Sequence, residues 1–95
     1  MEKMKFYTLD GQPITLMPDQ KGKYKGQINI LQIFDMGYAD WQFTPGGNCI
    51  ILTRAQKIAI ARQLNPDSKR AIIKHDQRDQ RKAIILAEAA KYGIK

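Results

Sequence analysis

The hydrophobic pattern of the chain changes at Thr53, and this change constrains the fold more than any other feature. Before Thr53, short runs of β-branched and aromatic residues are separated by turn residues, as in a small sheet. After Thr53, apolar residues recur at helical spacing. The sequence therefore predicts an α+β protein, with a small antiparallel β-sheet of four or five strands followed by two α-helices. Since 95 residues suit one domain, we expect a single domain over residues 1–95, with a sheet part (1–52) and a helical part (53–95).

The first two strands are expected to form a hairpin. Residues 5–9 and 14–17 have strand composition, and the turn signal Asp10-Gly11 lies between them.

The strongest strand pattern covers residues 27–34. Apolar residues occupy nearly both faces of this run, which predicts a strand at the centre of the sheet. Two further strands are expected at residues 38–43 and 49–52, on either side of a turn at residues 44–48.

The first helix is expected to begin after Thr53. Its hydroxyl can accept a backbone N–H two or three residues further on, as an N-cap. Residues 54–64 then place Ile58, Ala61 and Leu64 on one face of a helix.

The second helix is expected to follow at once. In Asn65-Pro66-Asp67, the asparagine can cap, the proline suits the first helical position, and the aspartate faces the positive end of the helix dipole. One long basic helix over residues 66–92, stopped by Gly93, is the first interpretation. Because residues 74–82 are polar on every side, two short helices around a charged loop are the second.

Charge is distributed unevenly between the two parts. The chain has a net charge of +7, but basic and acidic residues balance within residues 1–52, so the whole excess lies in residues 53–95. Such asymmetry indicates an acidic partner, and nucleic acid is the commonest one. An acidic protein surface, or a basic face that only contacts solvent, are the other interpretations.

Two surfaces are candidates for nucleic-acid binding. The sheet surface interleaves positive charge with aromatic rings, on which unpaired bases can stack; its residues are Lys21, Lys23, Tyr24, Lys25 and Trp41. The helical surface could neutralise several phosphates at once; its residues are Lys69, Arg70, Lys74, Arg78, Arg81 and Lys82.

No residue pattern indicates catalysis. His75 is the only histidine, and no second histidine or cysteine gives the spacing of a metal site, so we expect neither metal nor cofactor. Asp79 is expected to form an ion pair with Lys82 on the helix surface rather than to act as an acid or base.

The compartment is expected to be the cytoplasm. Cys49 is the only cysteine and cannot form an internal disulfide, which fits a reducing environment. The N-terminal residues lack the pattern of a signal peptide, and no apolar run is long enough for a membrane span.

Residues 24–56 resemble the single-stranded-DNA-binding family of the transcriptional coactivator positive cofactor four. The resemblance is carried by five pieces of sequence: Tyr24-Lys25-Gly26, Ile28 to Phe34, Pro45-Gly46, Ile50-Ile51-Leu52 and Gln56. It implies a four-stranded sheet whose curved surface binds single-stranded DNA, a helix that forms a homodimer, and DNA contacts from Tyr24 and Lys25. The family's basic positions on the later strands and around the Pro-Gly turn are occupied here by Ile33, Thr44, Gly47 and Asn48.

Taken together, these patterns predict a non-enzymatic nucleic-acid-binding protein that prefers single-stranded DNA and forms a homodimer. The alternative is a small protein-binding inhibitor, such as a phage factor that blocks a host or defence complex. It would contact acidic protein through the basic helix or the hairpin that carries Trp41.

Overall fold

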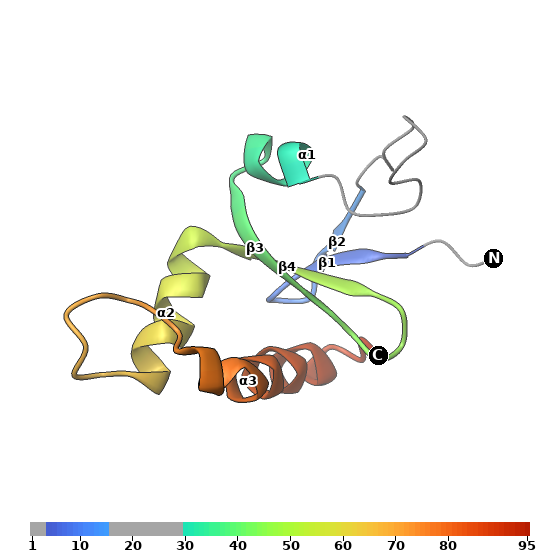
Figure 1. Ribbon diagram of the computed structural model, residues 1–95. Helices are drawn as coiled ribbons and strands as arrows, with labels where there is room; N and C mark the ends of the chain where they lie inside the picture. Colours follow the sequence, from blue (N-terminus) through green and yellow to red (C-terminus); the bar gives the residue numbers. More distant parts are fainter. Residues whose placement is uncertain (1–3, 16–29) are drawn as a thin grey trace.

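The computed structural model describes residues 4–15 and 30–95 of the protein (Figure 1). A four-stranded sheet is followed along the chain by two α-helices, which confirms the α+β class. The elements in chain order are β1 (Phe6–Thr8), β2 (Pro13–Ile14), α1 (Ile30–Asp35), β3 (Tyr38–Phe43), β4 (Cys49–Thr53), α2 (Arg54–Leu64), the 3₁₀ turn η1 (His75–Gln77) and α3 (Arg78–Lys91).

The sheet is mixed rather than antiparallel throughout, which corrects the expectation. Its strand order is β2-β1-β4-β3, and β1 runs parallel to β4. The residues Cys49 to Leu52 of β4 have no exposed surface, so this strand takes a central position and is paired on both sides. A parallel pair needs a long crossover, which the whole chain between β1 and β4 supplies.

The predicted hairpin is confirmed over its described part. β1 and β2 pair antiparallel, with Phe6 opposite Ile14. Residues 16 and 17, the end of the second predicted strand, lie outside the described residues.

The central strand predicted over residues 27–34 is wrong from residue 30 onward. Residues Ile30–Asp35 form helix α1, and residues 27–29 lie outside the description. A short run of apolar residues has no periodicity that separates a buried strand from a buried helix. The helix ends at Asp35, and the turn after it contains Gly37, whose φ of 90° suits glycine and whose N–H donates to the Phe34 carbonyl (3.0 Å).

Helix α2 has the predicted bounds and the predicted cap. The Gln56 N–H donates to Thr53 Oγ1 (3.2 Å), and the Thr53 N–H donates to Gln56 Oε1 (2.9 Å), so the two residues form a capping box. Ala61 is buried on the expected face, together with its neighbour Ile60.

The long helix predicted over residues 66–92 is wrong in its first third, and so is the alternative with a charged loop in the middle. Residues 65–74 form an irregular loop, while the charged segment that follows is η1 and the start of α3. The reason lies in Asn65 to Ser68. Ser68 N–H donates to the Asn65 carbonyl (3.2 Å), and Pro66 takes the second position of this turn, where its fixed φ is favoured.

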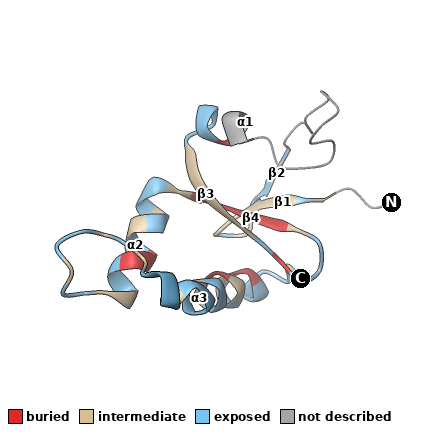
Figure 2. Ribbon diagram, in the orientation of Figure 1, coloured by how far each residue is buried: buried red, intermediate tan, exposed pale blue. Residues whose placement is uncertain are grey.

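Two hydrophobic clusters lie on opposite faces of the sheet. On one face, α2 and α3 cover Ile50 and Leu52 through Ile60, Ile85 and Ala89 (Figure 2). The two helices therefore form a layer under the sheet, with their charged side chains on its outer surface.

On the other face, Ile33 of α1 packs against Ile51, with Phe6 and Trp41 partly buried beside them. Trp41 is thus in contact with the core on this face, opposite the α2–α3 layer.

Candidate nucleic-acid interface

A groove runs between the open edge of β3 and the first turns of α3. Its volume is about 560 Å³, within the range of ligand sites. It is lined by Asp40, Trp41, Gln42, Phe43, Arg78, Asp79, Arg81 and Lys82.

The backbone of β3 forms one wall of this groove. Among the strands that the structure describes, β3 pairs with β4 alone and lies at the edge of the sheet. Thr44 N–H donates to the Asn48 carbonyl (2.8 Å), so Thr44 is a hydrogen-bonded position of the ladder with β4. Hydrogen-bonded and non-bonded positions alternate along an antiparallel strand. The backbone N–H and C=O groups of Trp41 and Phe43 therefore point away from β4, toward the open edge.

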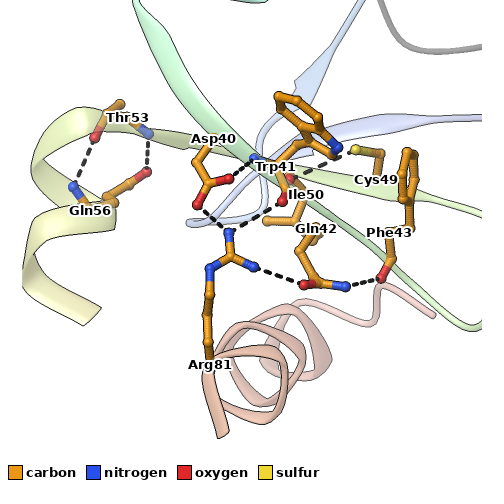
Figure 3. Close-up of polar contacts among 9 residues, drawn as sticks. All are labelled: Asp40, Trp41, Gln42, Phe43, Cys49, Ile50, Thr53, Gln56 and Arg81. Atoms are coloured by element: carbon orange, nitrogen blue, oxygen red, sulfur yellow. Dashed lines mark hydrogen bonds and ion pairs between the residues drawn. The ribbon is translucent and has the colours of Figure 1, made fainter. Parts of the chain in front are cut away.

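Three of these outward-facing backbone groups are bonded by side chains of the protein itself (Figure 3). Trp41 N–H donates to Asp40 Oδ1 (2.8 Å), Gln42 Nε2 donates to the Phe43 carbonyl (3.0 Å), and Arg81 Nη2 donates to the Trp41 carbonyl (3.3 Å). Three of the four outward groups of Trp41 and Phe43 are therefore covered by the side chains of Asp40, Gln42 and Arg81, which we call the edge network.

Arg81 holds the edge network together from α3. It lies one turn before Ile85 and two turns before Ala89, on the stripe that packs under the sheet. Its guanidinium forms an ion pair with Asp40 and donates to Gln42 Oε1 (2.9 Å), and its side chain is only 15% exposed. The structure thus places this predicted site residue in an internal network, with its charge balanced by Asp40.

Arg78 and Lys82 are the cations of the groove that remain available to a ligand. Both are exposed, and neither forms an ion pair with a residue in the described part of the chain. The ion pair expected between Asp79 and Lys82 is not among those formed there; the helix-surface pair that does form joins Lys91 to Glu88.

The basic surface continues from the groove toward the loop before η1. A smaller hollow of about 230 Å³ adjoins the groove and shares Arg78 and Arg81 with it. Lys74 and His75 complete its polar lining. Lys69 and Arg70 are exposed within the loop of residues 65–74. This loop projects from the end of the molecule that carries α2 (Figure 1).

The aromatic side chains of β3 lie on the opposite face of the sheet from the groove. Trp41 and Phe43 point away from α3, on the opposite face of the sheet from Arg81 (Figure 3). Trp41 packs on the cluster of Ile33 and Ile51, whereas Phe43 is 44% exposed. Phe43 is therefore the better stacking surface; its position two residues after Trp41 on the strand was the signal that could have identified it.

Four of the predicted site residues cannot be placed. Lys21, Lys23, Tyr24 and Lys25 lie outside the described residues, so the sheet surface is represented only by Trp41.

Cys49 is buried at the start of β4 and is no nucleophile at neutral pH. Desolvation by burial raises the pKa of its thiol from 9.0 to about 12, and this outweighs a hydrogen bond from the Gln42 backbone, which lowers the pKa. Because the thiolate is the reactive form, the thiol acts here as a small apolar side chain.

The raised pKa of Cys49 predicts a loss of stability at alkaline pH. Between pH 9 and about 12 the thiol ionises in the unfolded chain but stays protonated in the folded protein. The free energy of unfolding should fall there by up to about 1.4 kcal/mol per pH unit. Urea unfolding at a series of pH values measures this slope, with Cys49→Ala as the control. Equal slopes in the two proteins would contradict the assignment.

The residues that the structure describes contain no group of three or more His, Cys, Asp or Glu side chains that could hold a metal ion. Within the same ranges, 4–15 and 30–95, no helix is long and apolar enough to cross a lipid bilayer.

Comparison with known proteins gives no assignment, because no family model, curated protein or solved structure matches the chain. The resemblance to the positive cofactor four family stays a prediction. One of its pieces, the apolar strand from Ile28 to Phe34, is helical from Ile30 onward in this protein.

Proposed function

We propose that the protein binds nucleic acid without catalysing a reaction, that it prefers single strands, and that it acts in the cytoplasm. The observation that carries this proposal is the groove between β3 and α3, where Arg78 and Lys82, which form no ion pair within residues 4–15 and 30–95, lie beside the edge strand of Trp41 and Phe43.

The charges of the groove favour a polyanion. Exposed cations with no carboxylate partner gain most from phosphate, because binding also releases the counterions of the nucleic acid. Lys74 and the loop residues Lys69 and Arg70 extend the same sign of charge beyond the groove. A chain of phosphates matches such a row of positive charges better than a single small anion does.

The preference for single strands rests on Phe43. The exposed Phe43 ring lies across the edge strand from the basic groove, so it can stack on a base that reaches over this edge, and only when that base is unpaired. In a duplex the base faces are covered by their neighbours, so Phe43 would contribute nothing to binding.

Fluorescence of Trp41, the sole tryptophan, tests the proposal, because the Trp41 backbone lines the groove and its ring lies on the other face of the same edge strand, beside the exposed Phe43. Titration with a single-stranded oligonucleotide should change the emission at low salt. If Lys69, Arg70, Lys74, Arg78 and Lys82 each contact a phosphate, the logarithm of the association constant should fall against that of the salt concentration with a slope near −3.5, from about −0.7 per contact.

Two comparators separate the parts of the proposal. A duplex of the same length that binds as tightly would remove the single-strand preference while leaving nucleic-acid binding in place. Poly-glutamate that binds as tightly as the oligonucleotide would favour an acidic protein surface as the partner. No change in emission with any oligonucleotide at low salt would overturn the proposal.

The homodimer stays a prediction, and we include it in the proposal. Light scattering on the purified protein should give about twice the chain mass of 10.9 kDa. A measured mass of one chain, at the protein concentrations used for the binding titrations, would contradict the predicted homodimer.

A further inference from the structure

We infer that Asn65 and Gln77 are positioning residues for nucleic-acid binding: their side-chain amides hold the basic loop between α2 and η1 in the shape that presents its cations. This inference rests on the proposed function, because it concerns the same partner. It adds two uncharged residues to the site, and neither contacts the groove.

The two side chains form a reciprocal amide pair across the ends of the loop. Asn65 Nδ2 donates to Gln77 Oε1 (2.6 Å), and Gln77 Nε2 donates back to Asn65 Oδ1 (3.0 Å). The same amides bond the loop backbone, because Asn65 Nδ2 also donates to the Ile72 carbonyl (3.0 Å) and Gln77 Oε1 also accepts from Lys74 N–H (3.0 Å). The pair therefore joins the two ends of the loop and also holds its backbone at Ile72 and Lys74.

The other bonds of the loop to described residues are local ones, such as those from Ser68 N–H to the Asn65 carbonyl (3.2 Å) and from Ile72 N–H to the Arg70 carbonyl (2.9 Å), and they do not tie it to the rest of the protein. Ile73 packs against the core cluster below the sheet, while Ile72 is half exposed and the side chains of Lys69 and Arg70 are exposed. The amide pair and Ile73 are thus the main anchors of a segment that carries three cations. Without the pair, the loop would sample many conformations, and a ligand would have to order it on binding.

Ordering before binding raises affinity, because the entropy cost is met when the protein folds. The loop continues the basic surface of the groove, since Lys74 shares a hollow of about 230 Å³ with Arg78. A strand held in the groove by Arg78 and Lys82 can therefore extend onto Lys74, Arg70 and Lys69 only if the loop keeps its position.

A double-mutant cycle tests the inference, with the full chain and a single-stranded oligonucleotide as the probe. Gln77→Ala changes no charge, yet it should weaken binding roughly tenfold, as expected when several long side chains lose their preorganisation. It should also make the salt slope shallower by up to about 2, from three phosphate contacts at about 0.7 each. In the background Lys69→Ala/Arg70→Ala/Lys74→Ala, adding Gln77→Ala should have no further effect.

The control is Gln80→Ala, which removes an exposed glutamine of α3 outside the amide pair and should leave binding unchanged. Asn65→Ala removes the other side chain of the same amide pair, and it replaces Gln77→Ala in the test if that variant does not fold. An equal loss from Gln77→Ala in both backgrounds would overturn the inference, because the pair would then act by another route. The inference would also be overturned if the triple variant Lys69→Ala/Arg70→Ala/Lys74→Ala bound the oligonucleotide as tightly as the unaltered protein. If the unaltered protein binds no oligonucleotide at low salt, the proposed function itself fails, which is a separate result.

Discussion

The double variant Arg78→Glu/Lys82→Glu is expected to bind a single-stranded oligonucleotide about 100-fold more weakly at 0.1 M salt. Each lost phosphate contact should cost a factor of about 5 at this salt concentration, and the two new carboxylates add repulsion. The fold should tolerate both changes, because the side chains are exposed and an acidic residue at position 78 is favourable in the first turn of α3. The Trp41 titration measures the effect.

A matched control is available on α2. Arg54→Glu/Lys57→Glu makes the same change in net charge, also on exposed residues near the start of a helix, but neither residue lines the groove. Its affinity should fall only through the long-range change in charge, by much less than that of the groove variant. If both variants lose the same affinity, the groove is not the binding site and only the overall charge matters.

Arg81→Ala is expected to act on stability rather than directly on binding. The change would leave the Asp40 carboxylate, which is 20% exposed, without its cation, and would free the Trp41 carbonyl and Gln42 Oε1. Removing one partner of such a network should lower the free energy of unfolding by about 2 kcal/mol, less than for a fully buried pair because solvent still reaches both groups. Urea unfolding followed by circular dichroism gives the value.

Arg78→Ala is the control for this second prediction. It removes a guanidinium three residues away that is exposed and makes no ion pair in the described ranges, so the free energy of unfolding should change by no more than about 0.5 kcal/mol. Equal losses in the two variants would contradict the role of Arg81. Asp40→Asn provides the second arm of a double-mutant cycle, in which the Arg81 and Asp40 changes should not add.

The neighbouring cation Arg81 should be changed separately from Arg78 and Lys82. Arg78, Arg81 and Lys82 are equivalent in the sequence, as three cations within five residues. In the structure only Arg78 and Lys82 are available to a ligand. A variant that reversed all three charges would combine a loss of binding with a loss of folding, so its result could not be assigned to either.

Local signals in the sequence predicted the fold where a few neighbouring residues decide the structure. Thr53 and Gln56 are three residues apart and complete a capping box by themselves, so the start of α2 followed from their spacing. The strand of residues 38–43 and the buried strand that begins at Cys49 were also predicted, because the turn between them carries its own proline and glycine signal.

Features that depend on distant residues were not predictable in this way. Residues 30–35 form a helix because β4 already fills the centre of the sheet and Ile33 can pack over Ile51 from outside. The turn from Asn65 to Ser68 is local, but the position of the loop that follows it depends on the bond between Asn65 and Gln77, twelve residues later. Arg81 was assigned to a binding surface because its partner Asp40 lies forty-one residues earlier and on another element.

The edge network also bears on how copies of the protein can share one ligand. A protein that binds a polyanion without sequence preference collects along it, so neighbouring copies meet at a local concentration far above that in free solution. An unprotected strand edge under such crowding would join sheet to sheet and drive aggregation. Because Asp40, Gln42 and Arg81 already bond three of the outward groups of Trp41 and Phe43, we expect copies that bind as proposed to lie side by side on one strand and still separate when the strand is removed.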